Sequence, residues 1–255
     1  MPLELVTVPC LTDNYAFLIH DAASGQTALI DAPEVAPILA ALAQRNWHLT
    51  DILITHHHSD HIQAVPAVIA ATGARVTGAS ADAHRLPPLD RGVVDGDMLM
   101  IAGEACHVID VSGHTVGHIA FHFPASNLVF TADSLMAMGC GRLFEGSPAQ
   151  MWHSLSKLAA LPPETLVCSG HEYTAANLRF ALTLEPANPD LILRGRQITT
   201  ARDAGQATVP STLKDELNTN PFLRAGVASL KTAVGMPDAP DATVFAEIRA
   251  RKDKF

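Results

Sequence analysis

Short apolar runs bounded by polar or turn-forming residues fill the first two thirds of the chain. The runs 3–8, 14–20 and 27–31 predict strands. Helices are expected over 34–46, where apolar residues keep helical spacing, and over two further segments, 66–72 and 148–160. Further apolar runs predict strands at 51–54, 74–77, 98–101, 105–111, 118–123, 127–131 and 165–168.

The pattern changes after Tyr173, where proline-containing joints separate longer segments with helical character. These segments predict helices over 174–184, 189–204, 211–218 and 242–252, with no convincing strand. Strands alternating with helices, followed by a run of helices, favour an α/β layered domain with an all-helical appendage. We therefore predict two domains, 1–173 and 174–255.

Composition narrows the class of protein. A hydrophobic content of 48% with 17% charged residues is typical of a globular protein, and no apolar run approaches the roughly 20 residues that span a bilayer. The net charge of −9 argues against nucleic acid or an anionic membrane as a partner. No secretory signal is evident, and the four scattered cysteines predict free thiols. We expect a cytoplasmic monomer.

The stretch ITHHHSDHI directly follows the apolar run 51–54 and concentrates metal-binding side chains. Alternate residues of an extended segment face the same way, so His56, His58 and Asp60 are expected on one side and His57 on the other. His61 lies where the chain turns and can join from a second direction. A catalytic zinc typically takes three protein ligands, so this surplus indicates two metals.

Three other candidate ligands follow predicted strands, where layered folds carry their functional loops. They are His114, Asp133 and His171. One metal would be held by His56, His58 and His114, and a second by Asp60, His61 and His171, with Asp133 bridging both. These ligands suit zinc best, although iron and manganese accept the same donors.

The remaining histidines are expected to have ordinary roles. His57, His118 and His122 are interpreted as structural residues or as groups that orient ligands. The other members of this set have no ligand-like neighbours in the sequence: His20, His48, His84, His107 and His153.

The motif T-H-x-H-x-D-H resembles that of the metallo-β-lactamase superfamily, whose αββα sandwich carries a dinuclear site at one edge. Longer stretches are similar to the hydroxyacylglutathione hydrolase (glyoxalase II) family. They are TDNYAFLI (12–19), THHHSDH (55–61), GHTVGHI (113–119), FTADSL (130–135), GCGRLFEG (139–146), SGHEYTAANLRFA (169–181), VPSTLKDE (209–216), NPFLR (220–224) and RARKDKF (249–255).

The resemblance implies an αββα metallo-β-lactamase-like sandwich over 1–173, holding a dinuclear metal site with the ligand partition given above. It also implies a C-terminal all-helical, glutathione-binding domain over 174–255. Family members hold glutathione through a Lys and a Tyr after the GCG turn, where this chain has Arg142 and Phe144. The other implied substrate-binding residues are Tyr173, Arg249 and Lys252.

The implied reaction is hydrolysis of S-(2-hydroxyacyl)glutathione thioesters, such as S-D-lactoylglutathione to glutathione and D-lactate, the second step of methylglyoxal detoxification. We expect a metal-bridging hydroxide, oriented by Asp60 and Asp133, to attack the thioester carbonyl. The leaving thiolate, with a thiol pKa of about 8.5, departs without a general acid.

Other functions of the same fold stay open at this stage. They are a lactonase, a general thioesterase, an iron-dependent sulfur dioxygenase, a diiron electron-transfer protein, and a non-catalytic binding module. The complete set of seven ligands disfavours the mononuclear dioxygenase and the binding module. Histidine rather than glutamate at position 58 disfavours the diiron protein.

Overall fold

The computed structural model describes residues 2–255, which form two compact units. Unit 1 comprises the chain up to Asp110 together with Gly117–Ala132. Unit 2 comprises Val111–Val116 and Asp133–Phe255. The predicted domain boundary at residue 173 is a different division of the chain and stays a prediction.

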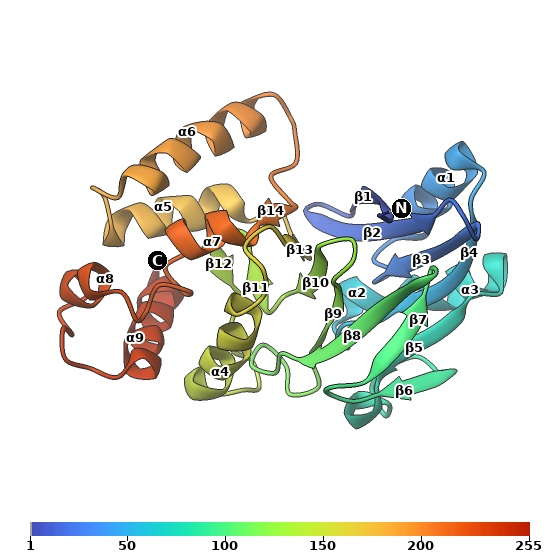
Figure 1. Ribbon diagram of the computed structural model, residues 1–255, viewed down its shortest axis with the longest axis horizontal. Coiled ribbons are helices and arrows are strands. Elements are labelled where there is room, and N and C mark those ends of the chain that lie inside the picture. Colours follow the sequence, from blue (N-terminus) through green and yellow to red (C-terminus); the bar gives the residue numbers. More distant parts are fainter. Residues whose placement is uncertain (1) are drawn as a thin grey trace. The chain divides into compact units, whose positions relative to one another are not determined.

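The first sheet of unit 1 has the strand order β1-β2-β3-β4-β5-β6. Its strands are β1 (Glu4–Cys10), β2 (Asn14–Asp21), β3 (Gln26–Ile30), β4 (His48–Leu53), β5 (Arg75–Ala79) and β6 (Arg91–Val93). The β1–β2 and β2–β3 pairs are antiparallel, and β3 to β6 run parallel. Helices α1 (Val35–Arg45) and α3 (Val65–Thr72) cover one face, since Ile38 and Val68 belong to the same buried cluster as Leu29 and Ile52 (Figure 1).

A second layer of unit 1 contains four antiparallel strands in the order β10-β9-β8-β7. They are β7 (Met98–Ile101), β8 (Glu104–Asp110), β9 (Ile119–Phe123) and β10 (Leu128–Ala132). The rings of Phe17 on β2 and Phe130 on β10 lie 5.5 Å apart, and Phe123 packs edge-on against Phe130 at 5.8 Å. These aromatic contacts join the two layers, as the predicted sandwich requires.

Unit 2 is mainly helical. Its elements are β11 (Leu135–Met136), β12 (Gly139–Cys140), α4 (Pro148–Ala159), β13 (Leu166–Ser169), α5 (Thr174–Leu184), α6 (Pro189–Asp203), β14 (Ser211–Thr212), α7 (Leu213–Thr219), α8 (Ala228–Ala233) and α9 (Asp241–Lys254). Side chains of Ser147, Asn188 and Thr212 cap the first turns of α4, α6 and α7 by accepting backbone N–H groups. The rings of Phe222 and Phe245 pack together at 5.7 Å in its core.

The structure departs from the predicted elements in short segments. The expectation of no strand after Tyr173 is wrong, because Ser211 and Thr212 pair antiparallel with Val167 and Leu166. A two-residue strand is too short to produce an apolar alternation. Across residues 2–255, no helix combines the length and apolar character needed to cross a bilayer.

All four cysteines are buried and carry free thiols. Burial raises the pKa of Cys10 to about 11, and it raises the pKa of Cys140 to about 11 as well. Burial also moves the thiol pKa values of Cys106 and Cys168 far above the ordinary range. The sequence predicts no disulfide framework, and in the structure the four thiols lie buried.

Candidate metal centre

The histidine-rich segment follows β4 without regular secondary structure, has an extended conformation at His58, and then turns into the short helix α2 (Ser59–Ile62). In unit 1 it brings Nε2 of buried His56 to 3.2 Å from Nδ1 of His58. The expected alternation of faces ends at His58, because Asp60 and His61 lie on α2 rather than on an extended chain. An oxygen of Asp60 lies 3.8 Å from Nε2 of His61.

His61 is oriented by a carboxylate that the sequence reading missed. Nδ1 of His61 lies 2.8 Å from Oδ2 of Asp31, a buried residue just after β3. Asp31 also accepts hydrogen bonds from the backbone N–H and the hydroxyl of Thr55, at 2.9 and 2.8 Å. Because a carboxylate accepts at Nδ1, the His61 ring is protonated there, and Nε2 is the nitrogen suited to a metal.

Two more neighbours hold this segment. The side-chain N–H of Asn14 donates to Oδ2 of Asp60 at 3.0 Å, and it also approaches the backbone carbonyl of Asp60 at 3.2 Å. The ring of His118 stacks on that of His56, with ring centres 4.5 Å apart. Asn14 lies within the stretch TDNYAFLI, and the similarity of this stretch to the family is the feature of the sequence that could have indicated a role for Asn14.

His57 points to different partners from those of its neighbours in the segment. Its Nδ1 lies 3.3 Å from a carboxylate oxygen of Asp82, and its Nε2 lies 3.3 Å from Arg85. Arg85 in turn forms an ion pair with Asp82 at 2.6 Å. The predicted role of His57, as a group that orients ligands or supports the structure, stays a prediction.

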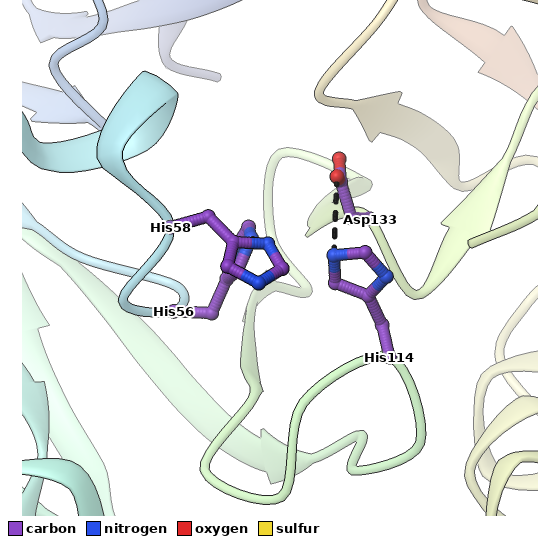
Figure 2. A group of neighbouring side chains, drawn as sticks. All are labelled: His56, His58, His114 and Asp133. Carbon is purple, nitrogen blue, oxygen red and sulfur yellow. Dashed lines mark hydrogen bonds and ion pairs between the residues drawn. The ribbon is translucent and has the colours of Figure 1, made fainter. Parts of the chain in front are cut away.

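In unit 2, three predicted ligands lie within contact of one another. Oδ2 of Asp133 lies 3.4 Å from Nε2 of His114 and 3.4 Å from Nε2 of His171. All three side chains are buried. Figure 2 marks the pair of His114 and Asp133 with a dashed line.

The donor chemistry of this cluster fits a divalent cation. Nδ1 of His114 lies 2.7 Å from the carbonyl oxygen of Arg142, which can only accept, so this nitrogen carries the proton. A metal-binding histidine commonly donates its second N–H to a carbonyl or carboxylate in this way. Nε2 of His114 is therefore the nitrogen with a lone pair, and it lies beside the carboxylate of Asp133.

Close backbone contacts fix the position of Asp133. Ala132, the residue before it, has a left-handed φ of 40°. A Cβ on Gly141 would lie 2.0 Å from the carbonyl oxygen of Asp133 and 2.9 Å from Nδ1 of His114. Only glycine fits there, so the GCG turn and the two candidate ligands can approach this closely.

Two aromatic side chains of unit 2 border this cluster. The ring of Tyr173 stacks on His171 with centres 4.7 Å apart, and Phe144 packs edge-on against His114 at 5.3 Å. Phe144 is 62% exposed and Tyr173 is 39% exposed. A bound ligand could therefore contact both rings.

The predicted basic residues lie in different surroundings. Arg142 is exposed, and its Nε lies 3.6 Å from a carboxylate oxygen of Asp253. Arg249 is buried and donates to the carbonyl oxygen of Cys140 at 3.0 Å and to Asp253 at 2.8 Å. The ammonium of Lys252 lies over the ring of Phe180, 5.3 Å from its centre. Burial is the main cause of a lowered pKa for Lys252, and nearby positive charges lower this pKa further.

The sequence was compared with known protein families and proteins. The metallo-β-lactamase superfamily model matches residues 12–171, and the model of the hydroxyacylglutathione hydrolase C-terminus matches residues 172–255. A hydroxyacylglutathione hydrolase of Cereibacter sphaeroides is 68% identical over 255 residues, which cover 100% of both chains. A hydroxyacylglutathione hydrolase of Fuscovulum blasticum is also 68% identical over 255 residues, again covering 100% of both chains.

The chain belongs to the hydroxyacylglutathione hydrolase family.

Solved structures agree with the metallo-β-lactamase fold of this family. ETHE1 from Myxococcus xanthus has a TM-score of 0.65 and 26% identity, over 99% of this chain and 98% of that chain. The protein TTHA1623, solved in a di-iron-bound form, has a TM-score of 0.63 and 26% identity, over 86% of this chain and all of that chain. The predicted metallo-β-lactamase fold with a mainly helical C-terminal part is therefore confirmed, and the short strand β14 is the departure from an all-helical part.

Proposed function

We propose that the protein hydrolyses S-(2-hydroxyacyl)glutathione thioesters, converting S-D-lactoylglutathione to glutathione and D-lactate in the second step of methylglyoxal detoxification. The observation that carries this proposal is the match of residues 172–255 to the C-terminus of hydroxyacylglutathione hydrolases. The metallo-β-lactamase fold alone serves many reactions, whereas this C-terminal part distinguishes one family within it. Full-length identities of 58–68% to proteins of that name support the same reaction.

The fold and its His/Asp groups indicate that the protein uses divalent metal. We propose that His56, His58 and His114 bind one ion. The second ion would be bound by Asp60, His61 and His171, and Asp133 would contact both. When bound, such a pair lowers the pKa of a water molecule from 15.7 to about 7 and polarises a carbonyl group.

The protein's own groups supply orientation and charge. Asp31 and the Arg142 carbonyl hold the protons on Nδ1 of His61 and His114. The carboxylates of Asp60 and Asp133 are hydrogen-bond acceptors that would orient the attacking water. A thiolate leaving group needs no proton donor, because a thiol pKa of about 8.5 makes the thiolate a weak base and a good leaving group. The mechanism therefore assigns no general acid.

The glutathione moiety would be held by residues of unit 2. The aromatic rings of Tyr173 and Phe144 offer contact surface, and Arg142 and Lys252 offer positive charge for the carboxylates of the peptide. Arg249 also belongs to this group, but we assign it an indirect role. Its guanidinium bonds to the Cys140 carbonyl, so it supports the turn that carries Arg142.

We further propose that the metals are zinc and that the protein is a cytoplasmic monomer with a domain boundary near residue 173. The matched ranges 12–171 and 172–255 support the boundary, and the His/Asp donor set suits zinc. Iron is the main competing metal, because TTHA1623 has been solved with two iron ions. Elemental analysis and light scattering of the purified protein test the metal and the monomer.

Other activities of the fold are less well supported. A lactonase, a general thioesterase or a sulfur dioxygenase would not need a glutathione-binding C-terminal part of this family. The alternatives would be favoured if the protein hydrolysed lactones or simple acyl thioesters at least as fast as glutathione thioesters.

The decisive experiment follows the loss of the thioester bond of S-D-lactoylglutathione. Purified protein is assayed as isolated, after chelation, and after zinc or iron is restored, with an acyl thioester of a non-peptide thiol as comparison. We expect hydrolysis that chelation abolishes and metal restores, with a strong preference for the glutathione thioester. Chelator-insensitive hydrolysis, or none with metal loaded, rejects the proposal.

A further inference from the structure

A small buried hairpin in unit 2 connects Asp133 with Arg142. The hairpin comprises residues 135–140, with β11 and β12 as its two arms, and all six residues are buried. Met138 in its turn has a left-handed φ of 61°. Buried backbone N–H and C=O groups need partners, and a hairpin with two-residue arms cannot pair all of its own.

The missing partners come from four side chains of the C-terminal part. Asn220 donates from Nδ2 to the carbonyl oxygens of Met136 and Gly139, at 3.1 and 2.9 Å. The remaining bonds are Asn177 Nδ2 to the Ala137 carbonyl at 3.1 Å, the Met138 N–H to Oε2 of Glu216 at 2.8 Å, and Arg249 to the Cys140 carbonyl at 3.0 Å. Thus five consecutive residues, 136–140, each have one backbone group bonded to these side chains.

Glu216 and Asn220 lie at the centre of this arrangement, and both are fully buried. Oε2 of Glu216 accepts from Nδ2 of Asn220 at 3.0 Å. Oε1 accepts from the hydroxyl of Ser211 at 2.6 Å and forms an ion pair with Arg194. A buried carboxylate with this many partners has one arrangement, because losing any of them leaves a charge or a donor unsatisfied.

The position of the hairpin determines the positions of the candidate ligands next to its ends. The N–H of Gly141 donates to the Ser134 carbonyl at 3.1 Å, next to Asp133. The carbonyl of Arg142 accepts the Nδ1 proton of His114 at 2.7 Å. The backbone of Gly141 packs tightly against that of Asp133, since a Cβ on Gly141 would lie 2.0 Å from the Asp133 carbonyl oxygen. Displacing the hairpin therefore moves both Asp133 and the group that orients His114.

We propose that Glu216 and Asn220 are positioning residues for the metal centre. The C-terminal part, on this view, has a role beyond holding glutathione: it fixes the hairpin 135–140 and through it Asp133 and His114. This inference rests on the proposed function only in assigning Asp133 and His114 as metal ligands. Neither Glu216 nor Asn220 contacts those two side chains directly, so their effect passes through the backbone.

Two nearly isosteric substitutions test the inference. N220D replaces the donor to two carbonyls by a carboxylate oxygen, and E216Q removes the charge that Arg194 pairs with. We expect zinc affinity, measured by competition with a chelating dye, to fall about 10- to 100-fold, the usual cost of losing support for a ligand. Amide hydrogen exchange in 135–140 should accelerate, and kcat should fall more than KM rises.

A matched control lies in the same unit. Glu185 is a buried carboxylate that accepts from Arg224 at 2.8 and 2.9 Å and from Ser229 at 3.2 Å. E185Q should lower the Tm as E216Q does, yet keep the zinc affinity and the exchange rates of the hairpin. Asn177→Ala, which removes a single hairpin bond, should produce a smaller loss of zinc affinity and decides the matter if N220D does not fold.

The outcomes separate this inference from the proposed function. If E216Q, N220D and N177A behave like E185Q, losing Tm alone, the positioning role is overturned. If wild-type protein fails to hydrolyse the thioester while the hairpin variants still lose zinc affinity and amide protection, the proposed function falls and the positioning role stands.

Discussion

Oδ2 of Asp31 lies 2.8 Å from Nδ1 of His61, although 30 positions separate the two residues in the chain. Asp31 reaches this point through a left-handed backbone conformation, with φ at 56°, directly after β3. The two hydrogen bonds from Thr55 lock the carboxylate in place. The ring orientation of a candidate metal ligand is therefore set by a residue outside the histidine-rich motif.

Replacing Asp31 by Asn should weaken zinc binding about 10- to 100-fold, because the amide offers fewer acceptors to His61 and Thr55. Zinc affinity from competition with a chelating dye is the measurement. Asp51→Asn is the control, since Asp51 is also a buried carboxylate but pairs with Arg75 at 2.9 Å. Equal zinc affinities in both variants would show that Asp31 has only a structural role.

Phe144→Tyr should lower KM for S-D-lactoylglutathione about 2- to 10-fold with little change in kcat. The added hydroxyl restores a hydrogen-bond donor worth about 0.5–1.5 kcal/mol. The residue is 62% exposed, so the Tm should stay close to that of the wild type. A KM that does not fall would place the glutathione moiety away from this ring.

If Lys252 binds a carboxylate of glutathione as proposed, substrate binding should weaken at alkaline pH. Its pKa lies below that of free lysine, chiefly because it is partly buried and also because Arg249 and Arg179 are nearby. As the pH rises through this lowered pKa, the ammonium of Lys252 loses its charge. KM should therefore begin to rise at a lower pH than it would if Lys252 had the pKa of free lysine.

Lys252→Arg keeps the charge at every accessible pH and should remove this alkaline rise in KM. Lys254→Arg, at an exposed position two residues on, should leave the rise unchanged. The measurement is the pH dependence of KM. A rise that persists in the Lys252 variant would assign it to another group.

Gly141→Ala should destabilise the protein by about 1–3 kcal/mol, because the added methyl group meets the backbone of Asp133. Zinc affinity should fall as well, since Asp133 and His114 must both move. Gly205→Ala is the control, as no atom lies within 4 Å of its added Cβ. Its left-handed φ of 69° costs about 1–2 kcal/mol without any effect on zinc. Denaturant unfolding and zinc titration measure both effects.

The sequence predicts the long elements well because their apolar spacing reports burial directly. The helix expected over 174–184 is α5 (Thr174–Leu184), and that expected over 148–160 ends one residue earlier. Short elements such as β11 and β12 escape prediction, since two residues carry no periodicity. Their stability comes from distant side chains rather than from local preference.

The candidate site is predicted unevenly for the same reason. The spacing of His56 and His58 predicts them as ligands, and the apolar runs before His114 and His171 predict these two. Asp31 resembles any carboxylate at a strand end. Arg249 lies in a basic tail, and nothing in that tail reveals that its guanidinium bonds to Cys140, 109 positions earlier.

The burial of all four thiols has a consequence for an enzyme whose proposed product is itself a thiol. A mixed disulfide forms when an exposed thiolate attacks oxidised glutathione, and buried cysteines with raised pKa values offer no such nucleophile. Burial and the raised pKa values therefore make these thiols poor nucleophiles toward oxidised glutathione in the folded protein. Oxidised glutathione added to the folded protein should therefore form little mixed disulfide with these cysteines.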